Sequence, residues 1–219
     1  MITLEDVKKH PAVDAYIVVS DRNLEILGYT EHGRRHVGLV AKRAREILAA
    51  LEYDERTVEL AAIAAYLHDI GNAINRHEHA SSGAVLAHVL LSQMGMEPHE
   101  IAEIVAAIGS HDEGGCEPVN PLSAALILAD KSDVHRSRVR NPDMIKFDIH
   151  DRVNYAVERS QIEVRKDERL IKLDLQIDTK ISPIAEYFEI FMERMLYCKR
   201  AANLLQCEFS LIINSNKML

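Results

Sequence analysis

The sequence has no tryptophan, and aromatic residues make up only 5% of its 219 residues. Nucleic-acid bases stack on exposed aromatic rings, so a base-stacking surface is not expected. Basic residues are also in the minority, with 26 lysines and arginines against 34 acidic residues and a formal net charge of -8. Because a general nucleic-acid binder needs a basic surface to neutralise phosphates, we expect no nucleic acid as a partner.

Long apolar runs are missing as well. No segment reaches the roughly 20 consecutive apolar residues of a membrane span, so we expect no membrane partner. A signal peptide would need an apolar core near the start of the chain. The corresponding stretch instead contains the charged residues Glu5, Asp6, Lys8, Lys9 and Asp14.

Cysteine is scarce: the chain has three, Cys116, Cys198 and Cys207, and no two of them have CxxC spacing. A secreted disulfide framework uses an even and patterned set of cysteines. The odd set here predicts a reducing, cytoplasmic setting and argues against a cysteine-based zinc site. Histidine, in contrast, is frequent, with 11 in the chain. The histidines are therefore the first candidates for chemistry.

The remaining composition is that of a globular protein, with 47% hydrophobic and 27% charged residues. Apolar residues recur three and four positions apart in several segments, which predicts amphipathic helices. The predicted helices cover about residues 3–10, 30–51, 54–71, 80–94, 98–111 and 122–130. The helix at 54–71 is apolar on most sides, so we expect it to be buried and to end deep in the molecule.

The pattern changes after about residue 141. Apolar and polar residues alternate on both sides of a polar turn within residues 162–177, which predicts a β-hairpin with one buried face. A helix at about 184–205 and a strand at 209–213 follow. We therefore predict a mainly α fold, with a helical body in residues 1–140 and a small β-β-α-β appendage in residues 141–219.

The predicted buried helix ends in the pair His68 and Asp69. Charged or metal-binding side chains at the end of an apolar helix are costly unless they are paired or ligated. Other polar side chains are predicted to face the same interior from neighbouring segments. They are His36, His79, His111 and Asp130. Any one of them could be a hydrogen-bonded core residue, but six buried polar groups on successive helices favour one shared site.

This order of residues resembles the HD superfamily of metal-dependent phosphohydrolases. The matching residues are His36, the run His68-Asp69-Ile70-Gly71, His79 in HASSGA, His111, and Asp130 in LADK. The resemblance covers about residues 30–140 and implies an HD-domain helical bundle. It also implies that His36, His68, Asp69 and Asp130 bind one divalent metal. His79 and His111 would then bind a second metal, with Asp69 as the bridge.

The chemistry that this ligand set would support is hydrolysis of a phosphate. Nitrogen and carboxylate ligands suit Fe, Mn, Co or Zn, and we favour one or two ions of Fe or Mn per chain. Two ions about 3.5–4 Å apart hold a hydroxide and clamp the phosphoryl oxygen that it attacks. We therefore predict cleavage of a phosphoester or phosphoanhydride bond in a nucleotide or other small phosphate. Asp69 and Asp112 are the predicted catalytic carboxylates, and Asp112 and Glu113 could orient imidazoles or the attacking water.

Four side chains close to these ligands in the sequence are candidate substrate contacts. They are Arg35, Asn72, Arg76 and Lys131. Asn72 stands where many members of the family have a lysine after His-Asp-Ile-Gly, which weakens or replaces a phosphate contact there. His32 lies one helical turn before His36, and we expect it at the protein surface.

Two runs bear on the subgroup within the family. The HxxxGA and LADK-like runs look similar to those of small bacterial HD proteins that cleave dinucleoside tetraphosphates. The stretch after His111 reads DEGGCEP and lacks the Gly-Tyr-Pro element of the cyclic-di-GMP subgroup, which excludes that subgroup.

The ligand set leaves two other functions open. Some members of the family with the same six residues are mixed-valence di-iron oxygenases, and ligands alone do not separate them from hydrolases. A non-catalytic, metal-binding regulatory module is the third alternative. The predicted appendage could pair strand edges in a homodimer or cover the site as a lid, but plain structural packing is the interpretation that we favour for it.

Overall fold

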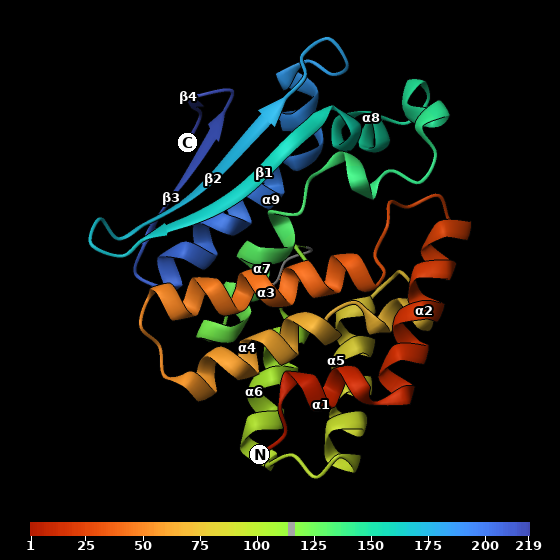
Figure 1. The fold of residues 1–219 in the computed structure, drawn as a ribbon, viewed down its shortest axis with the longest axis vertical. Coiled ribbons are helices and arrows are strands. Elements are labelled where there is room, and N and C mark those ends of the chain that lie inside the picture. Colours follow the sequence, from red (N-terminus) through yellow and green to blue (C-terminus); the bar gives the residue numbers. More distant parts are fainter. Residues whose placement is uncertain (114–116) are drawn as a thin grey trace.

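The computed structural model describes residues 1–113 and 117–219, so Cys116 and the middle of the DEGGCEP stretch lie outside it. The described chain is mainly helical and carries a small sheet near its C-terminus (Figure 1). The α-helices are α1 (Leu4–Lys9), α2 (Pro11–Ile26), α3 (Arg34–Ala50), α4 (Glu55–Leu67), α5 (His79–Gln93), α6 (Pro98–Gly109), α7 (Pro121–Lys131), α8 (Ile149–Ala156) and α9 (Ile184–Leu204). Short three-ten helices cover Ile70–Ala73, Arg136–Arg138 and Pro142–Lys146. None of the helices in the described ranges has the length and hydropathy to cross a membrane.

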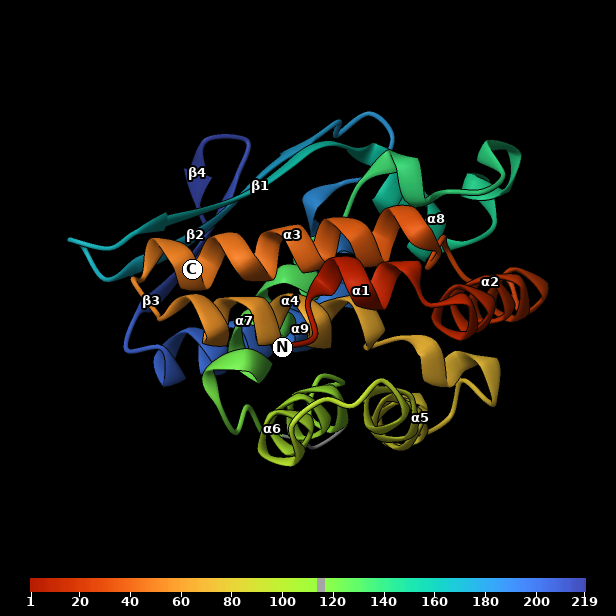
Figure 2. The same cartoon turned by 60° about the horizontal axis from the view of Figure 1, so that its bottom comes forward.

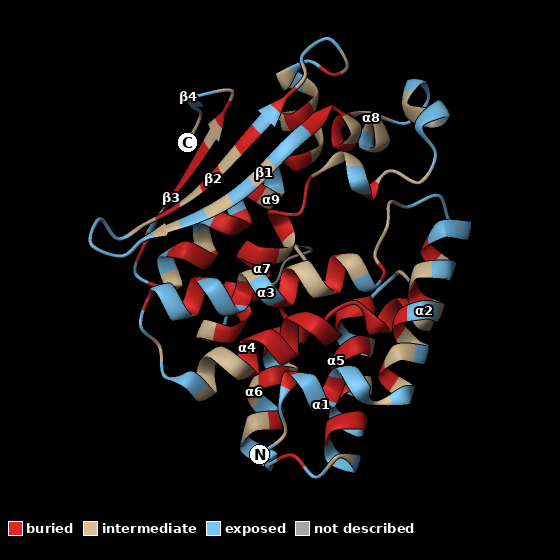
Figure 3. Ribbon diagram, in the orientation of Figure 1, coloured by how far each residue is buried: buried red, intermediate tan, exposed pale blue. Residues whose placement is uncertain are grey.

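Helix α4 lies at the centre of the helical body. Asp54 caps its first turn by accepting hydrogen bonds from the backbone N–H groups of Arg56 and Thr57. Beyond that turn every residue from 60 to 72 is buried, and Figure 3 shows this part of the helix as buried along its length. Helices α3, α6 and α7 pack around it. The predicted burial of this helix and of its C-terminal end is confirmed.

Helices α5 and α6 run side by side, as Figure 2 shows. Helix α2 begins at Pro11, and a proline is well tolerated in the first turn because its missing N–H would have no partner there. Helix α2 packs against the three-ten helix Ile70–Ala73. It therefore covers the segment that directly follows the His68–Asp69 pair.

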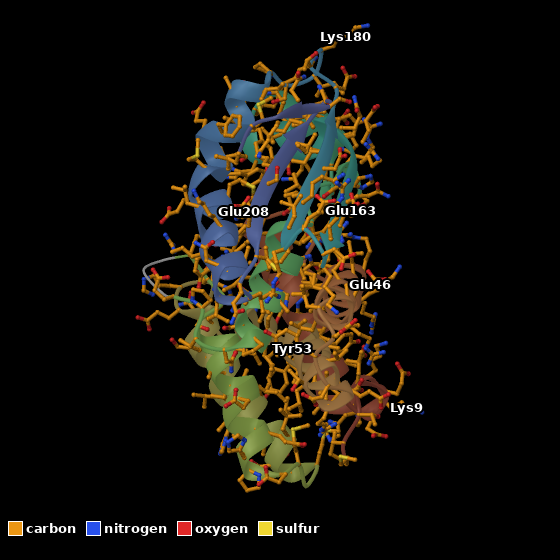
Figure 4. The ribbon with its side chains drawn as sticks, turned by 90° about the vertical axis from the view of Figure 1, so that its left-hand side faces the viewer. Lys9, Glu46, Tyr53, Glu163, Lys180 and Glu208 are labelled. Atoms are coloured by element: carbon orange, nitrogen blue, oxygen red, sulfur yellow. The ribbon has the colours of Figure 1, made fainter. Side chains whose placement is uncertain are left out.

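The predicted hairpin is confirmed and belongs to a larger sheet. Strands β1 (Val157–Arg165) and β2 (Leu170–Ile177) pair antiparallel, and β3 (Glu208–Ile213) pairs parallel with β2. A short strand, β4 (Asn216–Lys217), completes the order β1-β2-β3-β4 in the described chain. The alternating apolar residues of β2 are buried, because they face α9, which covers one side of the sheet in Figure 4.

Helix α9 connects β2 to β3 and packs on α7 as well as on the sheet. The buried apolar residues of the helical body and of the sheet therefore form one continuous core. The mainly α fold with a β-β-α-β appendage is confirmed. This core continues across the predicted boundary at residue 140 and does not mark it. The division into domains 1–140 and 141–219 therefore stays a prediction.

Replacement of Gly71 by alanine tests the close packing at the end of the His68–Asp69 segment. A Cβ atom at Gly71 would lie 2.0 Å from the backbone oxygen of His79 and 2.6 Å from the backbone nitrogen of Gly83. Because these are backbone atoms, α5 would have to move, and we expect a loss of about 3 kcal/mol in the free energy of unfolding. Urea denaturation measures this change.

Gly38→Ala is the matched control for this substitution. A Cβ atom there meets no atom within 4 Å, and the residue lies inside α3. Alanine is the better helix former, so we expect this variant to gain about 0.5–1 kcal/mol. Equal stability of the two variants would contradict the close approach of Gly71 to α5.

Candidate metal centre

Four helix ends and the loop between them bring the predicted ligands together. His68 and Asp69 follow the last residue of α4, and His36 lies in the first turn of α3. His79 begins α5, and His111 follows the end of α6. Asp130 lies in the last turn of α7 and completes the set.

The ligand atoms of this set converge on a small interior volume. The Nε2 atom of His36 lies 3.2 Å from Oδ1 of Asp130 and 3.6 Å from Oδ2 of Asp69. Nε2 of His68 lies 3.3 Å from the same Asp69 oxygen. Among the described residues, two groups of three could each hold a metal ion, because the ligand atoms within each group lie within 4.8 Å of one another. One group is His36, His68 and Asp130, and the other is His68, Asp69 and His111.

Asp69 lies between the two groups. Its Oδ2 atom faces His36 and His68, whereas its Oδ1 atom lies 3.6 Å from Nε2 of His79. His79 in turn lies against His111, with their Nε2 atoms 3.2 Å apart. The two oxygens of one carboxylate thus face two different sets of imidazoles.

The outward nitrogens of the imidazoles have partners that determine which ring nitrogen carries the proton. Nδ1 of His68 donates to the backbone oxygen of Ala65 at 2.7 Å, and Nδ1 of His111 donates to that of Ile108 at 2.7 Å. A carbonyl oxygen only accepts, so the proton of each neutral ring lies on Nδ1. In the neutral rings the lone pair of each Nε2 then points into the centre, as metal ligation requires. For His68 this form applies when a cation replaces the second proton of the ring.

Three buried atoms in the centre have no hydrogen-bond partner among the described residues: Nε2 of His36, Nε2 of His68 and Oδ2 of Asp69. An unpaired buried polar atom costs free energy, because it has lost its hydration without a replacement. A divalent cation coordinated by these three atoms would remove that cost. The residues present therefore fit a metal ion by position, by burial and by donor type.

The charges of the centre also favour a cation. Burial opposes ionisation of Asp69, but the charge of His68 outweighs it and holds the pKa of Asp69 well below its usual value. Burial likewise opposes protonation of His68, and the carboxylates of Asp69 and Asp130 overcome it and raise the pKa of His68 to about 10. A positive charge is thus drawn to the centre. Burial, with the charge of His68, keeps the pKa of His111 well below its usual value, so His111 stays neutral.

Asp133 was missed by the sequence analysis. It is buried three residues after Asp130, and its Oδ2 accepts a hydrogen bond of 2.7 Å from Nδ1 of His36. Arg35 donates to both of its carboxylate oxygens, at 3.3 and 2.8 Å. Arg138 donates to its backbone oxygen. The spacing of the two aspartates by three residues was the available signal, but it does not show that the second one is buried.

Lys131 lies in the interior, only 5% exposed. Its ammonium group contacts Asp130 at 2.9 Å and Glu113 at 2.6 Å. Arg194 of α9 also binds Glu113, at 2.8 Å. Asp112 is more open, with its side chain 40% exposed and Oδ2 4.0 Å from Nδ1 of His79. A chain of charges thus connects Asp130 to the helix that covers the sheet.

Two predicted substrate contacts, Asn72 and Arg76, lie on the Oδ1 side of Asp69. Asn72 is buried and donates to Oδ1 and to the backbone oxygen of Asp69, so it holds that carboxylate in place. Nη1 of Arg76 lies 3.3 Å from Nε2 of His79. The surface position expected for His32 is wrong. The structure shows it half-buried, with its ring centroid 5.3 Å from that of His36, because α2 and α3 enclose the loop that carries it.

A cavity of about 310 Å³ adjoins the centre. His32 and Arg76, which line it, contact His36 and His79 respectively, so one layer of side chains separates the cavity from the ligands on the side of the α2–α3 loop. Residues of α8 and α9 form its other walls. The C-terminal appendage therefore contributes to the surroundings of the candidate metal centre.

Comparison with known proteins agrees with this geometry. Residues 33–135 match the family model described as HD domain, and the match contains all six predicted ligands as well as Asp133. An uncharacterized protein of Methanocaldococcus jannaschii is similar to this chain, with 29% identity over 186 residues, which cover 75% of this chain and 70% of the relative. Its name states no activity.

Replacement of Asp133 by asparagine tests whether this residue positions His36. The substitution weakens the hydrogen bond that orients the ring and makes the imidazole a poorer ligand, so we expect 10- to 100-fold weaker metal binding. Competition with a metal chelator measures the affinity. Asp167→Asn, in the exposed turn between β1 and β2, is the control and should bind as the wild type does. A folded Asp133→Asn variant within about twofold of wild-type affinity would show that His36 needs no such partner.

Proposed function

Because residues 33–135 are an HD domain, characteristic of metal-dependent phosphohydrolases, we propose that this protein hydrolyses a small phosphate ester, such as a nucleotide or a related compound. The observation that carries the proposal is the convergence of three buried, unpartnered ligand atoms from His36, His68 and Asp69. Such atoms are destabilising unless something binds them, and the carboxylates beside them select a cation.

We assign the ligands in two groups. His36, His68, Asp69 and Asp130 would hold the first ion. His79 and His111 would hold a second, together with Asp69. This assignment is supported by the position of Asp69, whose Oδ2 faces the first group and whose Oδ1 faces His79. Iron or manganese suits these nitrogen and oxygen donors.

When bound, a divalent metal lowers the pKa of a water ligand from about 15.7 toward about 7 and polarises a phosphoryl oxygen. In the hydrolysis itself a water oxygen bonds to phosphorus, the bond from phosphorus to the ester oxygen breaks, and the leaving alcohol takes up a proton. Asp112 has the exposure and the position beside His79 to exchange that proton with solvent.

Other side chains bind and orient the substrate. Arg76 lies at the junction of the cavity and the centre, where its guanidinium group would bind phosphate oxygens in bidentate fashion. Asn72 holds Asp69 in place, and Arg35 acts on the centre through Asp133. Lys131 offsets part of the negative charge of Asp130 and Glu113, which reduces the repulsion of an anion near the site.

The test is release of inorganic phosphate from a panel of nucleotides and sugar phosphates, with Mn, Co or Fe(II) supplied. We expect turnover by the wild type, loss of turnover on chelation, and recovery when metal is returned. In the Asp69→Ala variant turnover should fall about 1,000-fold or more, because the substitution removes the carboxylate that both ligand groups share. Asp167→Ala is the matched control, since it removes an equivalent carboxylate from an exposed turn, and it should retain wild-type turnover.

Two outcomes would contradict the proposal. Phosphate release that Asp69→Ala leaves unchanged would place the activity outside this centre. Oxygen consumption coupled to substrate loss, with no phosphate released under strict anaerobiosis, would identify an oxygenase.

A further inference from the structure

The cavity beside the candidate metal centre has two chemically different sides. Arg76, Arg138 and Arg194 give it a cationic side, which lies toward the ligands. The opposite side belongs to α8 and carries Asp151 and Asn154. A phosphate group is matched by the first side only. The second side offers acceptors, and they need a ligand with donors.

Asn154 has an acceptor that nothing satisfies. The residue is 4% exposed, and its side-chain nitrogen donates to the backbone oxygen of His150 at 2.9 Å. That bond determines the orientation of the amide, because a carbonyl oxygen only accepts. The side-chain oxygen of Asn154 is buried and has no hydrogen-bond partner among the described residues. Asn154 lines the cavity, so a ligand that shifts this side chain can donate to the oxygen and remove the cost of the unpaired acceptor.

Asp151 is a second available acceptor on the same helix. It is half-buried, and the described residues provide no hydrogen bond or ion pair to its carboxylate. Burial and the neighbouring charge of Asp148 raise the pKa of Asp151, and together they outweigh His150 and Arg140, which lower it. Asp148 differs, since its Oδ1 atom already accepts from the backbone N–H groups of His150 and Asp151 at the start of α8. Asp151 and Asn154 lie three residues apart and therefore on one face of the helix.

We propose that this cavity binds a monophosphate ester of a polyhydroxylated alcohol, with hydroxyl groups of the alcohol donating to Asp151 and Asn154. The inference rests on the proposed function and specifies its substrate class. The phosphate faces the arginine side and the metal ligands, and the polyol lies against α8.

The size and charge of the cavity exclude longer phosphate chains. A volume of about 310 Å³ is at the lower end for ligand pockets and suits one sugar-sized group. A second or third phosphate extending toward α8 would approach Asp148 and Asp151, both of them acidic. Like charges at that distance repel, so a polyphosphate is disfavoured. Arginine on one side and unpaired acceptors on the other thus select for one phosphate and several hydroxyls.

Binding of two phosphonates tests the inference without hydrolysis, because their carbon–phosphorus bond replaces the ester bond. The ligands are a phosphonate analogue of ribose 5-phosphate and phenylphosphonate, which has no hydroxyl donors. Calorimetry on the metal-loaded protein gives the ratio of their dissociation constants. We expect the wild type to prefer the ribose analogue. Asp151→Asn and Asn154→Leu should each reduce that preference about tenfold, the effect of losing one hydrogen bond to a buried or charged acceptor.

The variants and controls distinguish the possible results. Asp151→Asn keeps the shape of the side chain, so it remains informative if Asn154→Leu unfolds. Asp167→Asn should keep the wild-type preference. A wild type with no preference, an unchanged ratio in the folded variants, or tighter binding of a dinucleoside tetraphosphate analogue would overturn the inference. If the ribose preference holds but no ester is hydrolysed, the binding site stands and the proposed hydrolysis fails.

Discussion

Two carboxylates in the interior, the buried Asp69 and the 12% exposed Asp130, impose the charge balance on which the rest of the centre depends. Each lies at the end of an apolar helix, where an isolated negative charge would be strongly unfavourable. Several side chains compensate for these two negative charges. Lys131 is held in the interior against Asp130, and Asn72 donates to Asp69. His68 takes up the remaining positive charge when no cation is bound. The same imbalance that makes a proton favourable there makes a divalent metal more favourable, so stability and cofactor binding have one cause.

Helical periodicity predicted that His111 and Asp130 face the interior, and the structure brings both close to other predicted ligands. Ile101, Ile104 and Ile108 form the buried face of α6, and His111 continues that face past the helix end. Asp130 follows Leu126 by four residues in the same way. These predictions succeeded because a buried helical face is a local property of the sequence. Asp133 did not follow from such a pattern, since it lies beyond the end of α7 and its partners are Arg35, which is far away in the sequence, and Arg138 of the following turn. For the same reason periodicity did not reveal that His32 is half-buried.

Local sequence patterns did not predict the wall of the cavity. Helix α8 was not predicted, although Asp148 caps it, because its eight residues are too short for a clear apolar repeat. Its position in the wall of the cavity depends on the packing of α8 against α9 and of α9 against α7. The predicted sequence of β-β-α-β elements was correct, but it did not state that β3 runs parallel to β2. That parallel pairing requires α9 to cross over the sheet, and the crossover brings Phe191 and Arg194 to the cavity.

The order of these segments along the chain also has a consequence for how the protein assembles. All six ligands lie between residues 36 and 130, whereas the walls from α8 and α9 lie between residues 148 and 194. Chains are synthesised from the N-terminus, and N-terminal units generally fold first. The parallel β2–β3 pair forms late, because its partners are separated by the whole of α9. The candidate ligands can therefore come together while they are still open to solvent, before α8 and α9, which form the far walls of the cavity, have left the ribosome.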